Sequence, residues 1–174
     1  LQILFLNIVT DIFPALALSA TEGNPKIMLR APRDPHEPII TWLHWIWIGI
    51  YGTIMGLIVL IVYLLSQFWY EYNIQTSITI SYLTLGLTSL WHVFNVRAGD
   101  LGVLINDVTK NIYVWFSLML GLFLLSGSMY ISGLNTVMHL VPIGIREWIF
   151  AFLLSIIPVI FGQIFKFFSI DKEQ

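Results

Sequence analysis

The sequence predicts an all-α fold: a polytopic membrane protein with a five-helix transmembrane bundle. Hydrophobic residues make up 57% of the 174 residues and charged residues 10%, whereas soluble domains have about 25% charged residues. The apolar residues also fall into long runs, each close to or above the roughly 20 residues that a helix needs to cross a bilayer. The predicted spans cover about residues 1–20, 39–69, 78–96, 112–134 and 148–168.

Charge and cysteine content exclude several classes of protein. The chain has 8 basic and 10 acidic residues, a net charge of −2, so no basic field is available to attract nucleic acid. It contains no cysteine, which rules out disulfides, thiolate metal sites and cysteine nucleophiles. Any metal site must therefore use oxygen atoms or histidine.

The first span carries polar residues near its middle: Asn7, Thr10 and Asp11, followed by Pro14. A carboxylate at the centre of a spanning helix costs about 2.5–3.5 kcal/mol, so we expect Asp11 to have a function. Residues three and four apart share a helix face, which predicts that Asn7, Thr10 and Asp11 converge on one patch. Proline has no N–H and clashes with the carbonyl four residues back, which predicts a freed carbonyl at Thr10.

This group of oxygen atoms favours a hard cation, and broken helices at membrane depth are where ion transporters place their sites. We therefore predict that Asn7, Thr10 and Asp11 are metal ligands. The alternative is that Asn7 and Thr10 join neighbouring helices and that Pro14 is a tolerated kink. The combination of Asp11 with Pro14 favours the cation site.

Two segments of the sequence resemble a known family. Residues 7–18, NIVTDIFPALAL, resemble the sixth transmembrane helix of type II cation-transporting P-type ATPases, the group of calcium and sodium pumps. Residues 28–38, MLRAPRDPHEP, are similar to the cytoplasmic loop that follows that helix in the family. The remaining spans are similar, more diffusely, to helices seven to ten, so the resemblance implies part of a ten-helix membrane domain.

The resemblance implies that the chain is the membrane portion of an ATP-driven cation pump, supplying part of the cation site and a helical scaffold. The transported cation would be Ca²⁺, Na⁺, K⁺, Mn²⁺ or H⁺. The sequence has no Asp-Lys-Thr-Gly-Thr phosphorylation motif and no phosphate-binding loop, so we assign it no catalytic residue and expect ATP and Mg²⁺ on domains outside it. Its expected partners are the lipid bilayer and the N-terminal helices and cytoplasmic ATPase domains of the same pump.

The second and third spans carry small and polar residues. Gly52 and Gly56 in the second span have a spacing that permits close approach of another helix, with chance as the alternative. One face of the third span is rich in polar groups and is predicted to face the bundle interior; its residues are Ser81, Thr84, Thr88, Ser89 and His92. By the resemblance, Ser89 stands where the family commonly has a Glu or Gln ligand. A hydroxyl is a weaker ligand than a carboxylate, so the resemblance leaves open whether this helix helps to build a second cation site.

The fifth span begins after Arg146 and Glu147, which are predicted to be an adjacent surface pair. Its later part resembles the end of the family's tenth helix, through Pro158, Gly162, Gln163 and Lys166. Lys166 is expected to extend its amine to the membrane interface.

Basic residues predict the orientation in the membrane. If the loops after the first and third spans share one side with the C-terminal tail, that side holds seven of the 8 basic residues, and the other side holds Arg146. The positive side faces the cytoplasm. This predicts a multi-pass protein of the cell membrane with a cytoplasmic C-terminus.

Two functional hypotheses remain open. One is the membrane portion of a cation pump, and the other is a non-enzymatic helical membrane module, standalone or a remnant, that binds a partner and transports nothing. Because the sequence begins inside an apolar run, we expect it to be the C-terminal part of a longer chain; a complete short protein is the alternative. An upstream phosphorylation motif before Leu1 would favour the pump.

Overall fold

Helices account for all the regular secondary structure in the described part of the chain, which confirms the all-α prediction. A computed structural model describes residues 1–20, 40, 42–96 and 107–170. The loop motif at 28–38 lies outside the described residues. The elements are α1 (Gln2–Asn7), the π-helical turn η1 (Ile8–Ile12), α2 (Phe13–Ser19), α3 (Trp42–Phe68), α4 (Ile74–Val96), α5 (Asp107–Lys110), α6 (Ile112–Tyr130), α7 (Leu134–Met138) and α8 (Ile145–Ile170).

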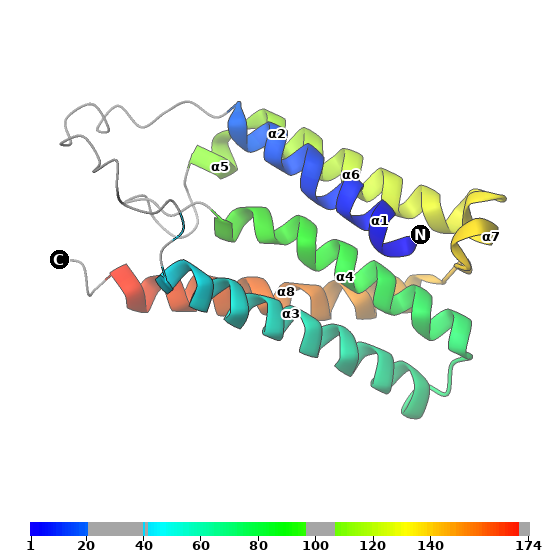
Figure 1. Ribbon diagram of the computed structural model, residues 1–174. Helices are drawn as coiled ribbons and strands as arrows, with labels where there is room; N and C mark the ends of the chain where they lie inside the picture. The colour runs from blue at the N-terminus through cyan, green and yellow to red at the C-terminus, as the bar shows by residue number, and fades with distance from the viewer. Residues whose placement is uncertain (21–39, 41, 97–106, 171–174) are drawn as a thin grey trace.

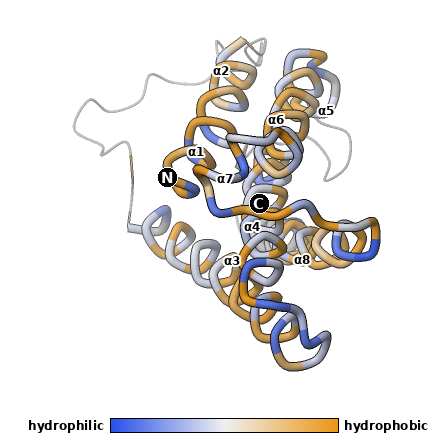
Figure 2. The backbone as a smooth tube through the Cα atoms, turned by 90° about the vertical axis from the view of Figure 1, so that its right-hand side faces the viewer, coloured by the Kyte–Doolittle hydropathy of each residue, from blue (hydrophilic) through white to orange (hydrophobic). Residues whose placement is uncertain are grey.

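Helix α4 lies at the centre of the bundle. Figure 1 shows it between a layer formed by α1, α2 and α6 and a layer formed by α3 and α8, and the end-on view in Figure 2 places it in the middle. Its contacts with α8 and α3 are the most extensive in the fold, and it also packs against α6 and η1. The two layers are therefore held together through α4.

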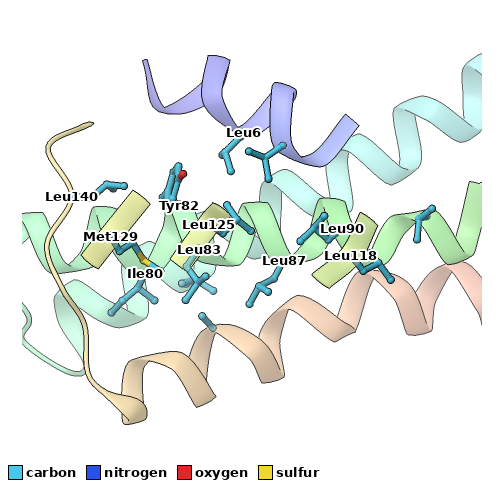
Figure 3. Close-up of a cluster of buried hydrophobic side chains, with 14 of the residues drawn as sticks. Leu6, Ile80, Tyr82, Leu83, Leu87, Leu90, Leu118, Leu125, Met129 and Leu140 are labelled. Atoms are coloured by element: carbon cyan, nitrogen blue, oxygen red, sulfur yellow. The ribbon is translucent and has the colours of Figure 1, made fainter. Parts of the chain in front are cut away.

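The packing between α4 and α6 depends on leucines that fit against glycines. A Cβ atom added at Gly121 of α6 would lie 2.7 Å from Cδ2 of Leu90, and one added at Gly86 of α4 would lie 2.8 Å from Cδ2 of Leu125. Because glycine has no side chain, each position accepts a leucine from the facing helix. The cluster in Figure 3 surrounds these contacts and includes Leu6, Ile80, Tyr82, Leu83, Leu87, Leu118, Met129 and Leu140.

The polar face of α4 is turned towards the bundle interior, as predicted. Thr84 and Thr88 are fully buried, and the other three residues of the predicted face are half-buried. The Thr84 hydroxyl donates to the Ile80 carbonyl at 2.8 Å, and the Ser81 hydroxyl donates to the Ser77 carbonyl at 2.8 Å. A hydroxyl that bonds to its own helix backbone satisfies its donor without a partner on another helix.

Four helical segments among the described residues are long and apolar enough to cross a membrane, namely Gln2–Ser19, His44–Phe68, Ile112–Tyr130 and Ile145–Ile164. Helix α4 has 23 residues and is long enough, but its hydroxyl groups make it less apolar than these four. The surrounding helices cover it, so it has less need of an apolar surface. The arrangement fits a helical membrane bundle.

Two helix ends differ from their predicted positions, one because of a capping side chain and one because of the backbone conformation. Helix α4 begins four residues before the predicted start because the Asn73 side chain accepts a hydrogen bond from the Thr76 N–H at 2.8 Å, as an N-cap does. Helix α6 ends at Tyr130 because Ile131 has extended backbone angles. Gly133 follows with a φ of +96°, a conformation that favours glycine.

The glycine pair of α3 faces away from the described helices. A Cβ atom at Gly52 or Gly56 would meet nothing within 4 Å. These residues therefore take no part in packing within the described part of the chain. The approach of another helix at this pair stays a prediction.

Candidate cation-binding site

Helices α1 and α2 form one helical segment that η1 interrupts at the predicted cation ligands. In a π-helical turn the backbone bonds join residues i and i+5, and such turns are frequent at functional sites. Pro14 is the second residue of α2 and is buried. Because proline lacks an N–H and clashes with the carbonyl of the residue four positions back, here Thr10, the regular α-helical pattern is broken here. The predicted disturbance beside Pro14 takes the form of this π turn.

The three predicted ligands differ in exposure. Thr10 is buried, with 6% of its surface exposed, whereas Asn7 and Asp11 are exposed. Thr10 and Asp11 are in contact, because the Thr10 hydroxyl donates a hydrogen bond to Oδ1 of Asp11 at 3.1 Å. No hydrogen bond within the described structure joins Asn7 to either of them. The structure therefore brings together two of the three residues and places Asn7 one turn earlier.

The exposed carboxylate lies on an otherwise apolar segment of spanning length. The packed face of this segment consists of the buried residues Leu6, Val9, Thr10, Pro14 and Ala17, and Asp11 is on the open side. An ionised carboxylate facing hydrocarbon carries a penalty of about 2.5–3.5 kcal/mol. The open side at Asp11 therefore calls for a polar partner or a bound cation.

The ligand set is a partial one. Among the described residues, no group of three or more His, Cys, Asp or Glu side chains is placed to hold a metal ion. The carboxylate of Asp11, the amide of Asn7 and the hydroxyl of Thr10 offer fewer oxygen atoms than the roughly six to eight that Ca²⁺ takes. Further ligands have to come from backbone carbonyls, water or other residues.

Ser89 is a half-buried residue of α4, the helix that packs directly against η1. A Cβ atom at Gly86, one turn before Ser89, would lie 3.1 Å from Cδ2 of Leu6. In the described structure no hydrogen bond joins Ser89 to the predicted ligands, so the structure does not bring it together with the Thr10–Asp11 pair.

Polar side chains also join α4 to α8, away from the predicted ligands. Gln163 Nε2 donates to Oδ1 of Asn95 at 2.7 Å and to the Phe94 carbonyl at 3.3 Å. Trp91 Nε1 donates to the Ser155 hydroxyl at 3.2 Å. The sequence marked Gln163 only through the family resemblance, and its one visible signal was a polar residue inside an apolar run. These bonds fix the position of α8 against the central helix.

Glu147 was predicted to form a surface pair with Arg146, but the structure shows that it also bonds to a distant residue. It is half-buried, and its Oε1 accepts a hydrogen bond from the Tyr72 hydroxyl at 2.7 Å. This bond joins the start of α8 to the connection between α3 and α4. The hydrogen bond to the carboxylate raises the pKa of Tyr72 above its usual value, and burial and the negative charge of Glu147 act in the same direction.

Comparisons with known proteins point to one family. A family model described as cation transporting ATPase, C-terminus, matches residues 1–168. The chain is 26% identical over 181 residues to calcium-transporting ATPase 1 of Bacillus cereus, and 28% identical over 159 residues to the calcium-transporting ATPase of Bacillus subtilis. It is also 23% identical over 200 residues to the endoplasmic reticulum calcium ATPase srcA of Aspergillus fumigatus.

The similarity extends over nearly all of this chain and a small part of each relative. The three alignments cover 95%, 91% and 95% of the chain, and 20%, 18% and 20% of the relatives. The chain therefore spans about a fifth of the length of the relatives it matches.

Proposed function

The chain belongs to the cation-transporting ATPase family, as its C-terminal membrane region, and on this premise we propose that it forms part of an ATP-driven calcium pump. In this pump Asn7, Thr10 and Asp11 supply part of the cation site within the membrane, and the remaining helices form the scaffold. The observation that carries the proposal is the exposed carboxylate of Asp11, bonded to the Thr10 hydroxyl at a π turn.

Calcium is the cation that these groups and the relatives favour together. The relatives named above are all described as calcium-transporting or calcium ATPases. Carboxylate, amide and hydroxyl oxygens are hard ligands, and Ca²⁺ tolerates a flexible set of them. Among the cations that the sequence left open, we therefore choose Ca²⁺ over Na⁺, K⁺, Mn²⁺ and H⁺.

The open side at Asp11 suggests how the site is completed. With few oxygen atoms of its own, the site takes its further ligands from helices of the same pump that lie outside these residues. ATP and Mg²⁺ bind on its cytoplasmic domains. The lipid bilayer surrounds the outer helices, which carry large exposed apolar residues, such as Leu57 and Leu60 on α3 and Phe116 and Phe123 on α6.

In the proposed pump the C-terminal end of the chain lies on the cytoplasmic side. The support for this orientation is the excess of basic residues that the sequence places on that side.

The test is Asp11→Asn in the complete pump, since this change keeps the shape of the side chain and removes its charge. We expect loss of calcium-dependent phosphorylation and calcium uptake into vesicles, with normal insertion into the membrane. Glu71→Gln is the matched control, because Glu71 is an exposed carboxylate in the connection between α3 and α4 and should leave uptake unchanged. Uptake within about twofold of the parent in Asp11→Asn, under about 0.5 kcal/mol, would contradict the proposal and leave the chain as a scaffold.

A further inference from the structure

A cavity lies where the α3–α4 connection meets the start of α8, and none of the predicted cation ligands lines it. It has a volume of about 320 Å³ and is lined by Tyr70, Tyr72, Arg146, Glu147, Ile149 and Phe150. The apolar segment of α3 ends at Phe68 and that of α8 begins at Ile145, and Figure 1 shows both points at the same end of the bundle. The cavity is therefore at the level where the bilayer meets water, the depth at which tyrosine is enriched.

The walls of the cavity are held in place by contacts among its own residues. The rings of Tyr70 and Tyr72 are stacked, with centroids 5.7 Å apart and planes 6° apart, and Phe150 meets Tyr70 edge-on at 5.2 Å. Glu147 accepts the hydrogen bond of Tyr72 at 2.7 Å, which ties the aromatic wall to α8. Gly144 allows this position, because a Cβ there would lie 2.8 Å from Oε2 of Glu147.

The cavity also brings two opposite charges together. Arg146 is exposed and makes no hydrogen bond or salt bridge within the described part of the chain, so its guanidinium is available to a ligand. A guanidinium binds phosphate oxygens through paired hydrogen bonds. The carboxylate of Glu147 and the faces of the tyrosine rings attract an ammonium group. One ligand with a phosphate and an ammonium group separated by a short linker would satisfy both.

We propose that this cavity binds the head group of a zwitterionic phospholipid, phosphatidylcholine or phosphatidylethanolamine, with Arg146 on the phosphate and Glu147 and Tyr70 on the ammonium group. Ile149 is 53% exposed beside the cavity, where it can contact the acyl chains. The volume of about 320 Å³ is at the small end of the range for ligand sites, which suits a head group. The proposal concerns the lipid and is independent of the cation site.

Competing ligands differ from this one in specific ways. An anionic lipid such as phosphatidylglycerol supplies the phosphate but no ammonium group, so it leaves Glu147 beside added negative charge. Free phosphocholine has both charged groups but no acyl chains to contact Ile149. These differences allow one binding experiment to distinguish the three ligands.

The experiment is native mass spectrometry of the complete pump in detergent, titrated with phosphatidylcholine, phosphatidylethanolamine and phosphatidylglycerol that carry the same acyl chains. We expect one molecule of either zwitterionic lipid to remain bound more tightly than phosphatidylglycerol. Arg146→Gln should weaken this binding at least fivefold, and Tyr70→Leu should weaken it for phosphatidylcholine. Glu71→Gln is the control that removes a nearby charge outside the cavity, and it should bind lipid like the parent.

Three results would overturn the proposal: unchanged lipid binding in Arg146→Gln, equal binding of phosphatidylglycerol and phosphatidylcholine, or competition by free phosphocholine at the concentration of the lipid. Circular dichroism of each variant provides the check on folding. Arg146 is exposed and makes no hydrogen bond or salt bridge within the described structure, so Arg146→Gln should leave the fold intact. This variant therefore tests the site even if Tyr70→Leu disturbs the packing of the aromatic rings.

Discussion

The hydroxyl of Thr10 reaches Oδ1 of Asp11 at 3.1 Å, although Thr10 faces the packed interior and Asp11 faces the open side of the helix. The two residues are neighbours in sequence, and the π turn η1 (Ile8–Ile12) contains both. A buried donor therefore orients a carboxylate that has to remain available on the outside. The pair links the interior packing of the bundle to the candidate cation site.

Thr10→Val tests this link, because valine keeps the shape of threonine and removes the donor. A hydrogen bond to a charged group contributes about 1.5–3 kcal/mol, so the apparent affinity for Ca²⁺ should fall about tenfold or more. The measurement is the calcium dependence of ATP hydrolysis in the complete pump. Thr53→Val is the control, since the exposed Thr53 hydroxyl donates to the Gly49 carbonyl of its own helix and to no other group in the described part of the chain. Equal affinities in the two variants would remove Thr10 from the site.

Gly121→Ala should destabilise the contact between α4 and α6. The new Cβ would lie 2.7 Å from Leu90 Cδ2, and excess volume in a packed interior costs about 1–3 kcal/mol. Gly52→Ala is the control, because a Cβ at Gly52 meets nothing within 4 Å. Thermal unfolding in detergent should show a lower midpoint for Gly121→Ala alone. Adding Leu90→Ala should remove part of the difference; without such coupling the packing account is wrong.

Gln163→Leu should weaken the attachment of α8 to α4. It removes the donor to Asn95 Oδ1 at 2.7 Å and leaves an amide oxygen of a buried residue without that partner. Such a loss costs about 1–3 kcal/mol in a protein interior, and about 0.6 kcal/mol on average in membrane bundles. Denaturation by a harsh detergent should occur at a lower concentration than for Gln75→Leu, where Gln75 is exposed at the start of α4. Equal midpoints would show that the bond contributes nothing measurable.

The Tyr72–Glu147 contact should disappear at high pH. The pKa of Tyr72 is raised in the folded chain above its ordinary value of 10.0, first by the hydrogen bond to Glu147. The contribution to stability is therefore fully present below about pH 10.0 and is lost as the pH rises through the folded pKa. As the pH rises through this range, the free energy of unfolding of the parent should fall more than that of the Tyr72→Phe variant. Parallel curves for the two proteins would argue against the contact.

The helical architecture could be predicted from the sequence because it depends on local patterns. The apolar runs predicted where the helices lie. The polar residues Ser81, Thr84 and Thr88 predicted which face of α4 is turned to the interior, and Thr84 and Thr88 are indeed buried. The disturbance at Thr10 could be predicted because proline has a fixed effect on the residue four positions back. Its form as a π turn could not be predicted, because η1 packs against α4 and α6, and no local pattern contains these contacts.

Contacts between distant segments could not be predicted for the same reason. Tyr72 and Glu147 are 75 positions apart in sequence, and Asn95 and Gln163 are 68 apart. Neither pair has a regular spacing that would relate its members. Arg146 and Glu147 were interpreted as a surface pair because they are adjacent in sequence, whereas the fold turns Glu147 towards Tyr72.

The central position of α4 has a consequence for how the chain is made. Helix α4 is less apolar than the four segments around it, so on its own it enters a bilayer less readily than they do. During synthesis it follows α3, while its most extensive partner, α8, is made after the other described helices. We therefore expect α4 to rely on α3 during membrane insertion and to reach its final position only when α8 is complete. A chain stopped before α8 would expose the hydroxyls of α4 to lipid, and its removal by cellular quality control would follow.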